Sequence, residues 1–343
     1  MALNATKLSD FLKQKHVGFL QRCLRVLPSD LSFFDTHRLS LAFFVISSID
    51  LLNSNALLNE ERRAIIDWIY SMQIPPNEGI GKRGFRGSSA NSGDPYDFGH
   101  LTMIYSALAS LIILGDDLKR INRQAIVEAI KELQLEDGSF AATHGSESDM
   151  RFVYSAVVVS HILQDWSGID IDKTVTFIKK CLSYEGGFGL RPGCEAHGGS
   201  TYCAVASLSL MDKLNFALDK SEIKSIIRWC VMKQVSGFQG RPNKEPDTCY
   251  SFWIGATLKI LDTYHFTDVN ANFDFVMSTQ DPIVGGFGKN SYSPPDPMHT
   301  YLGLAGLSLI PTTNKILSTI NPEVNISERA TEHLRCIHRQ HCV

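Results

Sequence analysis

The chain has 343 residues, of which 44% are hydrophobic and 20% are charged, and its net charge is -3 at pH 7. This hydrophobic content allows a large buried core, and the near-neutral charge argues against a nucleic-acid-binding or membrane-surface protein. No apolar stretch reaches the roughly 20 residues that a membrane-spanning helix needs. Charged residues between Lys7 and Lys15 also interrupt the N-terminus, so we expect no membrane span and no signal peptide.

The eight cysteines are scattered along the chain without the paired spacing of a disulfide framework. We therefore expect reduced thiols and a cytoplasmic protein. Residues Asn325 to Ser327 match the N-glycosylation pattern, but this short pattern is common by chance and irrelevant in the cytosol.

Taken in chain order, two helical stretches come first, near residues 8–27 and 37–52. A segment rich in Gly, Pro and Ser, residues 75–97, predicts a long loop. From residue 84 onward the chain repeats, because a Gly-Phe or Ser-Phe pair recurs every 48 to 55 residues. The phenylalanines of these pairs are Phe85, Phe140, Phe188, Phe238 and Phe287.

Each pair is followed by a polar loop and then by a helix of small, apolar residues, which begins near residues 105, 154, 202, 253 and 302. These helices are apolar nearly all round, so we expect them to be buried, whereas the second helix of each copy is amphipathic and should form an outer layer. With one more hairpin before Phe85, about six helical hairpins would close into a ring. The sequence thus predicts an all-α domain over residues 1–343, with residues 319–343 as a C-terminal tail outside the repeat.

Candidate metal ligands lie where two of the inner helices begin. Asp247 and Cys249 come just before one inner helix, and His299 comes at the equivalent place in the next copy. Because equivalent positions of neighbouring repeats become neighbours in space, a carboxylate, a thiolate and an imidazole should meet there. This set is typical of a zinc site with three protein ligands and an open fourth position.

Cations and hydrogen-bond donors gather around the same helix ends. His197 and Tyr250 lie at these ends, and Arg241, Lys244 and Lys289 lie in the loops before them. Helix N-termini attract anions, so the set suits a diphosphate. Taken singly, Cys249 could be a small buried residue and the charged residues could simply be solvated. The combination, rather than any one residue, favours an anion site beside a metal site.

Three segments resemble the family of protein prenyltransferase β subunits. They are Glu-Ala-His-Gly-Gly-Ser-Thr at 195–201, the run from Arg241 to Trp253, and Asp-Pro-Met-His-Thr-Tyr at 296–301. The resemblance extends from about His16 to Ser318 and is strongest to the type I geranylgeranyl branch. It implies an α/α toroid fold, which agrees with the ring expected from the repeat.

The resemblance also implies an activity and partners. The enzyme would transfer a 20-carbon geranylgeranyl group from geranylgeranyl diphosphate to the cysteine of a C-terminal CaaX motif, forming a thioether. The acceptors would be CaaX-ending small GTPases and similar proteins. The chain would be the catalytic β subunit of an obligate heterodimer with a helical α subunit.

Matching positions imply the site residues, with one zinc ion held by Asp247, Cys249 and His299. Lys289 and Tyr250 would join these three as catalytic residues. The residues implied for geranylgeranyl diphosphate are Ser40, Arg151, His197, Gly198, Gly199, Arg241, Lys244 and Tyr250. The residues implied for the peptide are His100, Thr102 and Phe152.

Two positions favour the geranylgeranyl branch over the farnesyl branch. Lys289 stands where a farnesyl enzyme is expected to have a magnesium-binding Asp, and its ammonium group could replace the ion, so Mg²⁺ should not be required. Ser40 stands where a farnesyl enzyme is expected to have a bulky Trp, which leaves depth for a 20-carbon chain. The family usually has Thr at the position of Ser40, which is a conservative difference. It usually has Ala at Thr102 and an aromatic residue at Leu302, and these two differences leave the preference for the terminal residue of the peptide open.

Other functions remain as alternatives. The chain could be a farnesyl-type or Rab-type prenyltransferase β subunit, or a non-catalytic helical ring that acts as a scaffold. Terpene cyclases have a similar ring, but the sequence has no acid-rich segment of the Asp-Asp type facing the expected cavity. The Cys- and His-rich segment 336–342 lies outside the repeat, and its candidate ligands are too close together for the usual structural zinc site.

Overall fold

The computed structural model describes residues 8–26, 29–75, 82–91 and 98–341. Within these ranges, six inner helices surround a central axis: α3 (Arg38–Leu51), α5 (Leu101–Leu114), α7 (Met150–Leu163), α9 (Gly198–Leu210), α12 (Tyr250–Ile260) and α14 (Pro297–Ser308). Six outer helices cover them: α2 (Lys13–Arg25), α4 (Asn59–Ser71), α6 (Arg123–Leu133), α8 (Ile171–Lys180), α11 (Lys220–Val231) and α13 (Val269–Ser278). Shorter elements are η1 (Ser29–His37), η2 (Ser89–Asn91), α10 (Leu214–Ala217), η3 (Tyr264–Phe266) and η4 (Pro311–Lys315).

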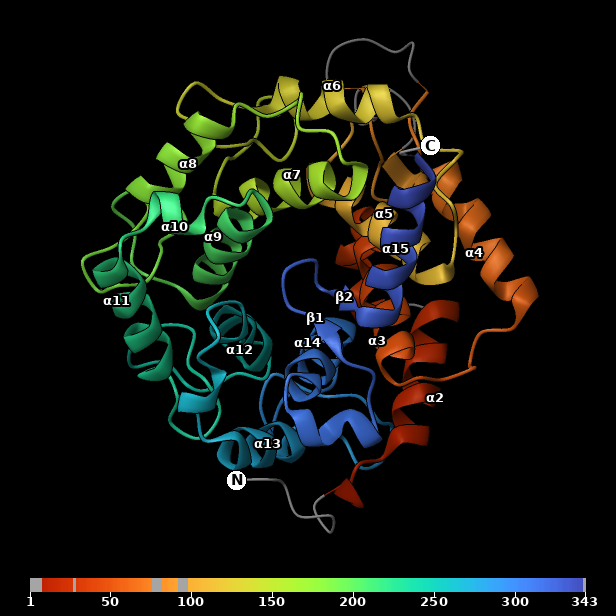
Figure 1. Cartoon of the computed structure of the whole chain (residues 1–343). Coiled ribbons are helices and arrows are strands. Elements are labelled where there is room, and N and C mark those ends of the chain that lie inside the picture. Colours follow the sequence, from red (N-terminus) through yellow and green to blue (C-terminus); the bar gives the residue numbers. More distant parts are fainter. Residues whose placement is uncertain (1–7, 27–28, 76–81, 92–97, 342–343) are drawn as a thin grey trace.

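The inner helices form a closed ring. Each one packs against the next along the chain, and α14 packs against α3, so the last hairpin meets the first (Figure 1). The prediction of about six hairpins in two helical layers is therefore confirmed for the described part of the chain. Of the long loop expected at 75–97, residues 76–81 and 92–97 lie outside the described residues.

The two layers follow from how apolar each helix is. Every residue of inner helix α5 except Thr102 is buried, because α5 touches neighbours on all sides. Outer helix α8 buries only one stripe, including Val175, Phe177 and Ile178, and exposes its charged residues to water. Small residues let the inner helices approach closely; a Cβ on Gly306 would lie 2.6 Å from the Cβ of Ser251.

The repeated phenylalanines fold the connection between each outer helix and its inner helix. All five are fully buried, and each forms an isolated antiparallel bridge with a residue after the outer helix. The bridged pairs are Gln73 with Phe85, Gln134 with Phe140, Leu182 with Phe188, Gln234 with Phe238, and Gln280 with Phe287. The bridge turns the chain from the outer layer to the inner layer at the same place in each copy.

The four glutamines of these bridges also join neighbouring hairpins. In each case the side-chain oxygen accepts a hydrogen bond from the backbone N–H of the residue that caps a following outer helix. These acceptor–donor pairs are Gln73 with Asn122, Gln134 with Asp170, Gln234 with Asp268, and Gln280 with Leu12. Because Leu12 precedes α2, the last of these bonds links the sixth hairpin back to the first.

His16 on α2 completes this closing contact. Its Nδ1 atom accepts a hydrogen bond of 2.9 Å from the Gly286 N–H, and its Nε2 atom donates to Gln280 Oε1 at 2.9 Å. The imidazole stacks on Phe287 at 4.6 Å and is fully buried. The neutral imidazole therefore uses both ring nitrogens in hydrogen bonds. A proton on Nδ1 would break the bond from Gly286, because two N–H donors would then face each other.

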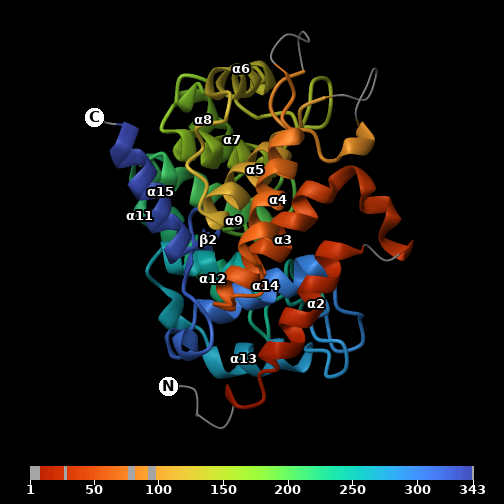
Figure 2. The ribbon, with the colours of Figure 1, turned by 90° about the vertical axis from the view of Figure 1, so that its right-hand side faces the viewer.

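The segment 319–343, set apart in the sequence as a C-terminal tail, is built into the structure as far as His341. Strands β1 (Ile320–Asn321) and β2 (Ile326–Ser327) form an antiparallel hairpin, and α15 (Glu328–His341) follows. Figure 2 shows α15 lying across one end of the ring. It packs there because Ala330 and Leu334 are buried against the core. No helix in the described ranges combines the length and the apolar character needed to cross a membrane.

Protonation of His16 should weaken the ring at acidic pH. Burial lowers the pKa of His16 to about 4, against the opposing effect of its hydrogen bond to Gln280. The unfolded chain, with a His pKa near 6.5, binds this proton more readily, so the stabilising effect is complete above about pH 6.5 and decreases as the pH falls towards 4. Between pH 7.5 and pH 5 the contribution of His16 to the free energy of unfolding should fall by about 2 kcal/mol.

Urea denaturation at both pH values, compared between the wild type and His16→Asn, measures this contribution. Asn offers an acceptor to the Gly286 N–H but does not titrate. An equal loss of stability in both proteins would show that His16 does not carry the effect.

Candidate active site

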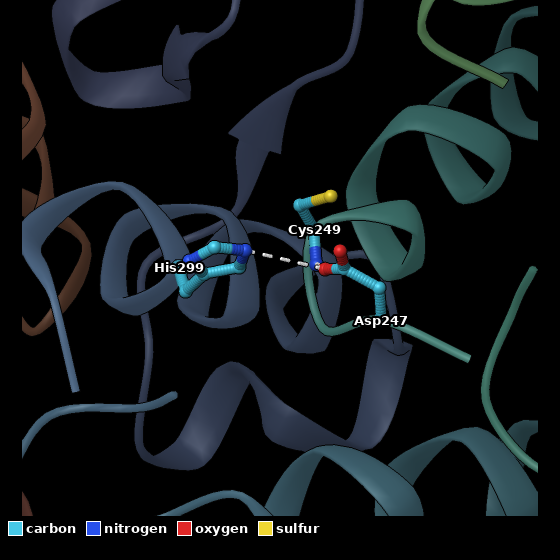
Figure 3. A group of neighbouring side chains, drawn as sticks. All are labelled: Asp247, Cys249 and His299. Carbon is cyan, nitrogen blue, oxygen red and sulfur yellow. Dashed lines mark hydrogen bonds and ion pairs between the residues drawn. The ribbon is translucent and has the colours of Figure 1, made fainter. Parts of the chain in front are cut away.

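Three potential metal ligands come together at the ends of two neighbouring inner helices. Asp247 and Cys249 precede α12, His299 lies in the first turn of α14, and Figure 3 shows the three side chains side by side. One ligand atom from each lies within 4.8 Å of the others, and His299 Nε2 is 3.4 Å from Asp247 Oδ1. Tetrahedral ligands of zinc, bound at roughly 2.0–2.3 Å, lie at comparable distances from one another. The spacing predicted from the repeat is therefore what places these residues together.

Short hydrogen bonds fix the segment that carries Asp247 and Cys249. Asp247 Oδ1 accepts a bond of 2.9 Å from the Cys249 N–H. Between them, the buried Thr248 hydroxyl donates to the Gly288 carbonyl at 2.7 Å, and the Thr248 N–H donates to the Lys289 carbonyl at 3.0 Å. These bonds join the start of α12 to the loop before α14, and so connect the segments that carry the triad.

Asp296 orients the third ligand. As the cap of α14, it accepts a hydrogen bond from the His299 backbone N–H through Oδ1. Its other oxygen, Oδ2, accepts from the His299 imidazole Nδ1–H at 2.6 Å. This bond fixes the tautomer and leaves Nε2 as the atom that faces Asp247 and Cys249. A carboxylate behind a histidine is the usual support for a metal-bound imidazole.

The triad holds protons where a cation would bind. Burial lowers the pKa of His299, but hydrogen bonds to Asp247 and Asp296 outweigh burial and raise it to about 9. Burial and the neighbouring Asp247 raise the pKa of Cys249 well above that of a free thiol. For Asp247, burial is outweighed by its bonds to His299 and Cys249, and the pKa is lowered. A divalent cation would replace the protons of His299 and Cys249, so this Asp-Cys-His set fits zinc.

A second polar cluster adjoins the triad. The Tyr250 hydroxyl, on the residue after Cys249, is 3.0 Å from His197 Nε2, while His197 Nδ1 caps α9 by accepting from the Gly199 N–H. Gly198 and Gly240 leave room for the tyrosine ring; a Cβ on Gly240 would lie 2.0 Å from it. The position predicted for anion binding therefore has two hydrogen-bonding side chains already held in place.

The expected cations lie near this cluster and differ in exposure and in their ion-pair partners. Lys289 Nζ lies 4.0 Å from Asp247 Oδ2, and its side chain is 56% exposed. Arg241 is half-exposed and contacts Glu195 at 3.2 Å, and Lys244 is exposed on the same loop. Lys289 therefore has a buried partner in Asp247, whereas Arg241 pairs with the half-exposed Glu195.

Arg151 is more tightly engaged than the sequence suggests. Its guanidinium forms a bidentate pair with Asp149, from Nε to Oδ1 and from Nη2 to Oδ2, and also contacts Glu147 at 3.3 Å. Because Asp149 is buried and caps α7, this arginine is fixed against the helix end rather than free to follow a ligand.

Beside these groups lies a cavity of about 490 Å³ inside the ring. Its lining includes seven of the residues expected to contact lipid or peptide: Ser40, His100, Thr102, Arg151, Phe152, His197 and Gly199. The triad, Gly198, Tyr250 and the loop cations are not part of this lining, but Tyr250 contacts the lining residue His197 at 3.0 Å. The size and the mixture of many apolar with few polar residues are typical of a small-molecule site.

Sequence reasoning missed part of the lining and one supporting residue. The lining also contains Phe43, Phe44, Tyr105, Tyr154, Cys203, Trp253 and Asn325. The aromatic members come from inner helices that are apolar nearly all round. The sequence of such a helix does not distinguish side chains packed in the core from side chains that line a cavity. Asp296 could be foreseen as a helix cap, but its second bond to His299 required the structure.

A model of the prenyltransferase alpha-alpha toroid domain matches residues 11–326. This chain belongs to that family. The type-1 geranylgeranyl transferase β subunit of Dictyostelium discoideum is 40% identical over 342 residues, covering 93% of this chain and 96% of that protein. The corresponding subunit of Arabidopsis thaliana is 36% identical, covering 93% of this chain and 89% of that protein.

A solved structure extends the comparison to three dimensions. Candida albicans protein geranylgeranyltransferase-I, complexed with GGPP, matches with a TM-score of 0.88 and 29% sequence identity, covering 95% of this chain and 99% of that chain. Both the resemblance to protein prenyltransferase β subunits and the expected α/α toroid are confirmed.

Loss of the Asp296 carboxylate should weaken metal binding without removing a ligand. We expect Asp296→Asn to reduce zinc affinity by about 10- to 100-fold, because the imidazole loses the carboxylate that orients it. Competition with a chromogenic chelator measures the affinity. Asp268→Asn is the matched control, since Asp268 caps α13 in the same way and lies outside the triad. Equal zinc affinity in the two variants would exclude a role for Asp296 beyond capping.

Proposed function

We propose that this chain is the catalytic β subunit of a zinc-dependent protein geranylgeranyltransferase of type I. The reaction would transfer the 20-carbon group of geranylgeranyl diphosphate to the cysteine of a C-terminal CaaX motif. One observation carries the proposal: an Asp-Cys-His triad and a cluster of anion-binding groups adjoin the mouth of an apolar cavity. The Candida protein that shares this fold is described as complexed with GGPP, which supports the same lipid here.

The cavity suits an isoprenoid chain. Phe43, Phe44, Tyr154 and Trp253 give it aromatic walls, and Ser40 leaves its wall open where a larger residue would intrude. Apolar surface buried there would contribute most of the lipid affinity. His100, Thr102 and Phe152, nearer the mouth, would contact the last residues of the peptide.

The diphosphate would lie against the cluster at the mouth. Negative charge grows on the leaving oxygen as the bond between C1 of the lipid and that oxygen breaks. His197 and Tyr250 can donate hydrogen bonds to it, and Arg241, Lys244 and Lys289 supply positive charge. Groups fixed in place before the reaction stabilise such a transition state most strongly.

Asp247, Cys249 and His299 would hold the zinc ion. When bound there, zinc supplies the positive charge that favours the thiolate form of the acceptor cysteine near neutral pH. The acceptor sulfur then forms a bond to C1, and the diphosphate departs with the electron pair of the broken C–O bond. Asp296 keeps His299 oriented throughout, and no side chain is needed as a general base once the sulfur is a thiolate.

A helical α subunit would complete the enzyme, and CaaX-ending small GTPases would be its substrates. The seven cysteines in the described residues are all free thiols, which supports a cytoplasmic location.

A transfer assay tests the function. Together with a prenyltransferase α subunit, the chain should transfer geranylgeranyl from its diphosphate to a peptide with a CaaX motif ending in Leu faster than to peptides ending in Ser or Met. Cys249→Ala should lose zinc and nearly all turnover, while it still binds the lipid diphosphate. Preferred transfer of farnesyl to the Ser and Met peptides would assign the chain to the farnesyl branch, and a purified complex without zinc would favour the scaffold alternative.

Metal dependence tests the role of Lys289. In the wild type the ammonium group supplies charge to the diphosphate, so turnover should not change when Mg²⁺ is added or chelated. In Lys289→Asp the carboxylate can bind Mg²⁺ instead, and turnover should rise with millimolar Mg²⁺ from a reduced starting rate. Lys224→Asp, on the outer helix α11, is a charge-matched control. The same Mg²⁺ response in wild type and Lys289→Asp would refute this role.

A further inference from the structure

The turn between β1 and β2 projects into the centre of the ring. Figure 1 shows this turn inside the circle of inner helices, although it belongs to the segment after the last hairpin. It comprises residues 322–325, of which Val324 and Asn325 are 2% and 3% exposed. A backbone buried among apolar helices must find hydrogen-bond partners there.

Tyrosines of four inner helices supply these partners. Tyr154 donates to the Glu323 carbonyl at 2.9 Å, Tyr105 donates to the Val324 carbonyl at 3.1 Å, and Tyr301 donates to the Asn325 carbonyl at 2.7 Å. Tyr202 supports Tyr154, since its hydroxyl donates to the Tyr154 hydroxyl at 3.0 Å. The turn is therefore fixed to α5, α7 and α14 directly and to α9 through one relay.

Asn325 is the residue of this turn that reaches the cavity. Among the described residues, it is the one member of the C-terminal segment in the cavity lining. Its side-chain oxygen also lies 2.9 Å from the Tyr301 hydroxyl, whose single proton is shared between this oxygen and the Asn325 carbonyl. The residue has a φ of +58°, a conformation that Asn tolerates and Gly adopts freely. Asn325 thus lines the cavity beside Tyr105 and Tyr154, which stand about one helical turn further along α5 and α7 than Thr102 and Arg151.

The turn is also held from behind. The Asn321 side chain accepts from the backbone N–H groups of Glu323 and Val324. After β2, Arg329 pairs with Asp50 of α3 at 2.7 Å and donates to the Ile113 carbonyl at the end of α5. Further along α15, His338 donates to the Ile162 carbonyl of α7 at 2.9 Å. The C-terminal segment therefore closes one end of the ring and resists being pushed outward.

We propose that the β1–β2 turn is the depth stop of the isoprenoid cavity, and that Asn325, held by Tyr301, determines the longest isoprenoid the enzyme accepts. This inference rests on the proposed function, since it assumes that the cavity holds the lipid. The walls of the cavity come from the repeats, but the limit of its depth comes from a segment outside them.

The test compares two lipid lengths. The wild-type heterodimer and its variants are assayed with the 20-carbon and 25-carbon diphosphates, and the ratio of kcat/KM for the longer over the shorter lipid is measured. Asn325→Gly removes the four non-hydrogen atoms of the side chain, which frees part of the space of one isoprene unit, and Gly fits the positive φ. The ratio should rise by about 10-fold or more, within the range that a pocket change of this size produces.

A second variant leaves the volume of the cavity lining almost unchanged. Tyr301→Phe removes only the hydroxyl that holds Asn325, so the turn should yield more easily and the ratio should rise in the same direction by a smaller factor. Tyr264→Phe is the matched control, because Tyr264 is also buried but lies outside the cavity lining and should leave the ratio unchanged.

The outcomes separate this inference from the proposed function. If the wild type transfers the 20-carbon lipid but the ratio is unchanged in Asn325→Gly and in Tyr301→Phe, the turn is not the depth stop. If Asn325→Gly does not fold, the ratio in Tyr301→Phe decides alone. A wild type that neither binds nor transfers the 20-carbon lipid would instead overturn the proposed function.

Discussion

The site depends on closure of the ring, and one repeated hydrogen bond provides it. A glutamine after an outer helix accepts from the backbone N–H that begins a following outer helix, and Gln280 makes this bond to Leu12 at the other end of the chain. Because the ends are joined in the same way as neighbours, α14 has a fixed partner on each side. Between these fixed neighbours, the first turns of α12 and α14 bring Asp247 and His299 to 3.4 Å from each other.

The charges and pKa shifts of Asp247, Cys249 and His299 then distinguish this triad from an ordinary polar contact. A structural histidine needs one acceptor, but His299 has carboxylates on both ring nitrogens, and its pKa rises to about 9 as a result. Beside it, burial keeps Cys249 protonated. The two carboxylates stabilise the protonated imidazole, and a divalent cation bound here would replace the protons of His299 and Cys249. The donor set is therefore compatible with a metal centre.

The sequence predicts much of this architecture because a repeat converts spacing into position. The six hairpins, the buried small-residue helices and the Asp-Cys-His triad all follow from register alone. Hydrogen bonds and ion pairs that occur in only one copy of the repeat cannot be predicted from the register. Arg151 matches the expected lipid contact by position, yet Asp149 and Glu147 hold it against the end of α7. Asp296 occupies a cap position like Asp268, but only Asp296 has a histidine imidazole within reach of its second oxygen.

The contacts of the C-terminal segment also could not be predicted from the register, because this segment lies outside the repeat. The register of the repeat predicts that Tyr105, Tyr154 and Tyr202 lie at equivalent positions of their inner helices. It does not identify the hydrogen-bond acceptors of their three hydroxyl groups inside the apolar ring. Buried hydroxyls are almost always hydrogen-bonded, so a segment outside the repeat has to supply acceptors. That segment contains Asn325, whose match to the glycosylation pattern has no consequence in the folded chain because the residue is 3% exposed and bonded to Tyr301. The inner helices of the repeat therefore line the sides of the cavity. In our proposal its depth is limited by the β1–β2 turn, which lies outside the repeat.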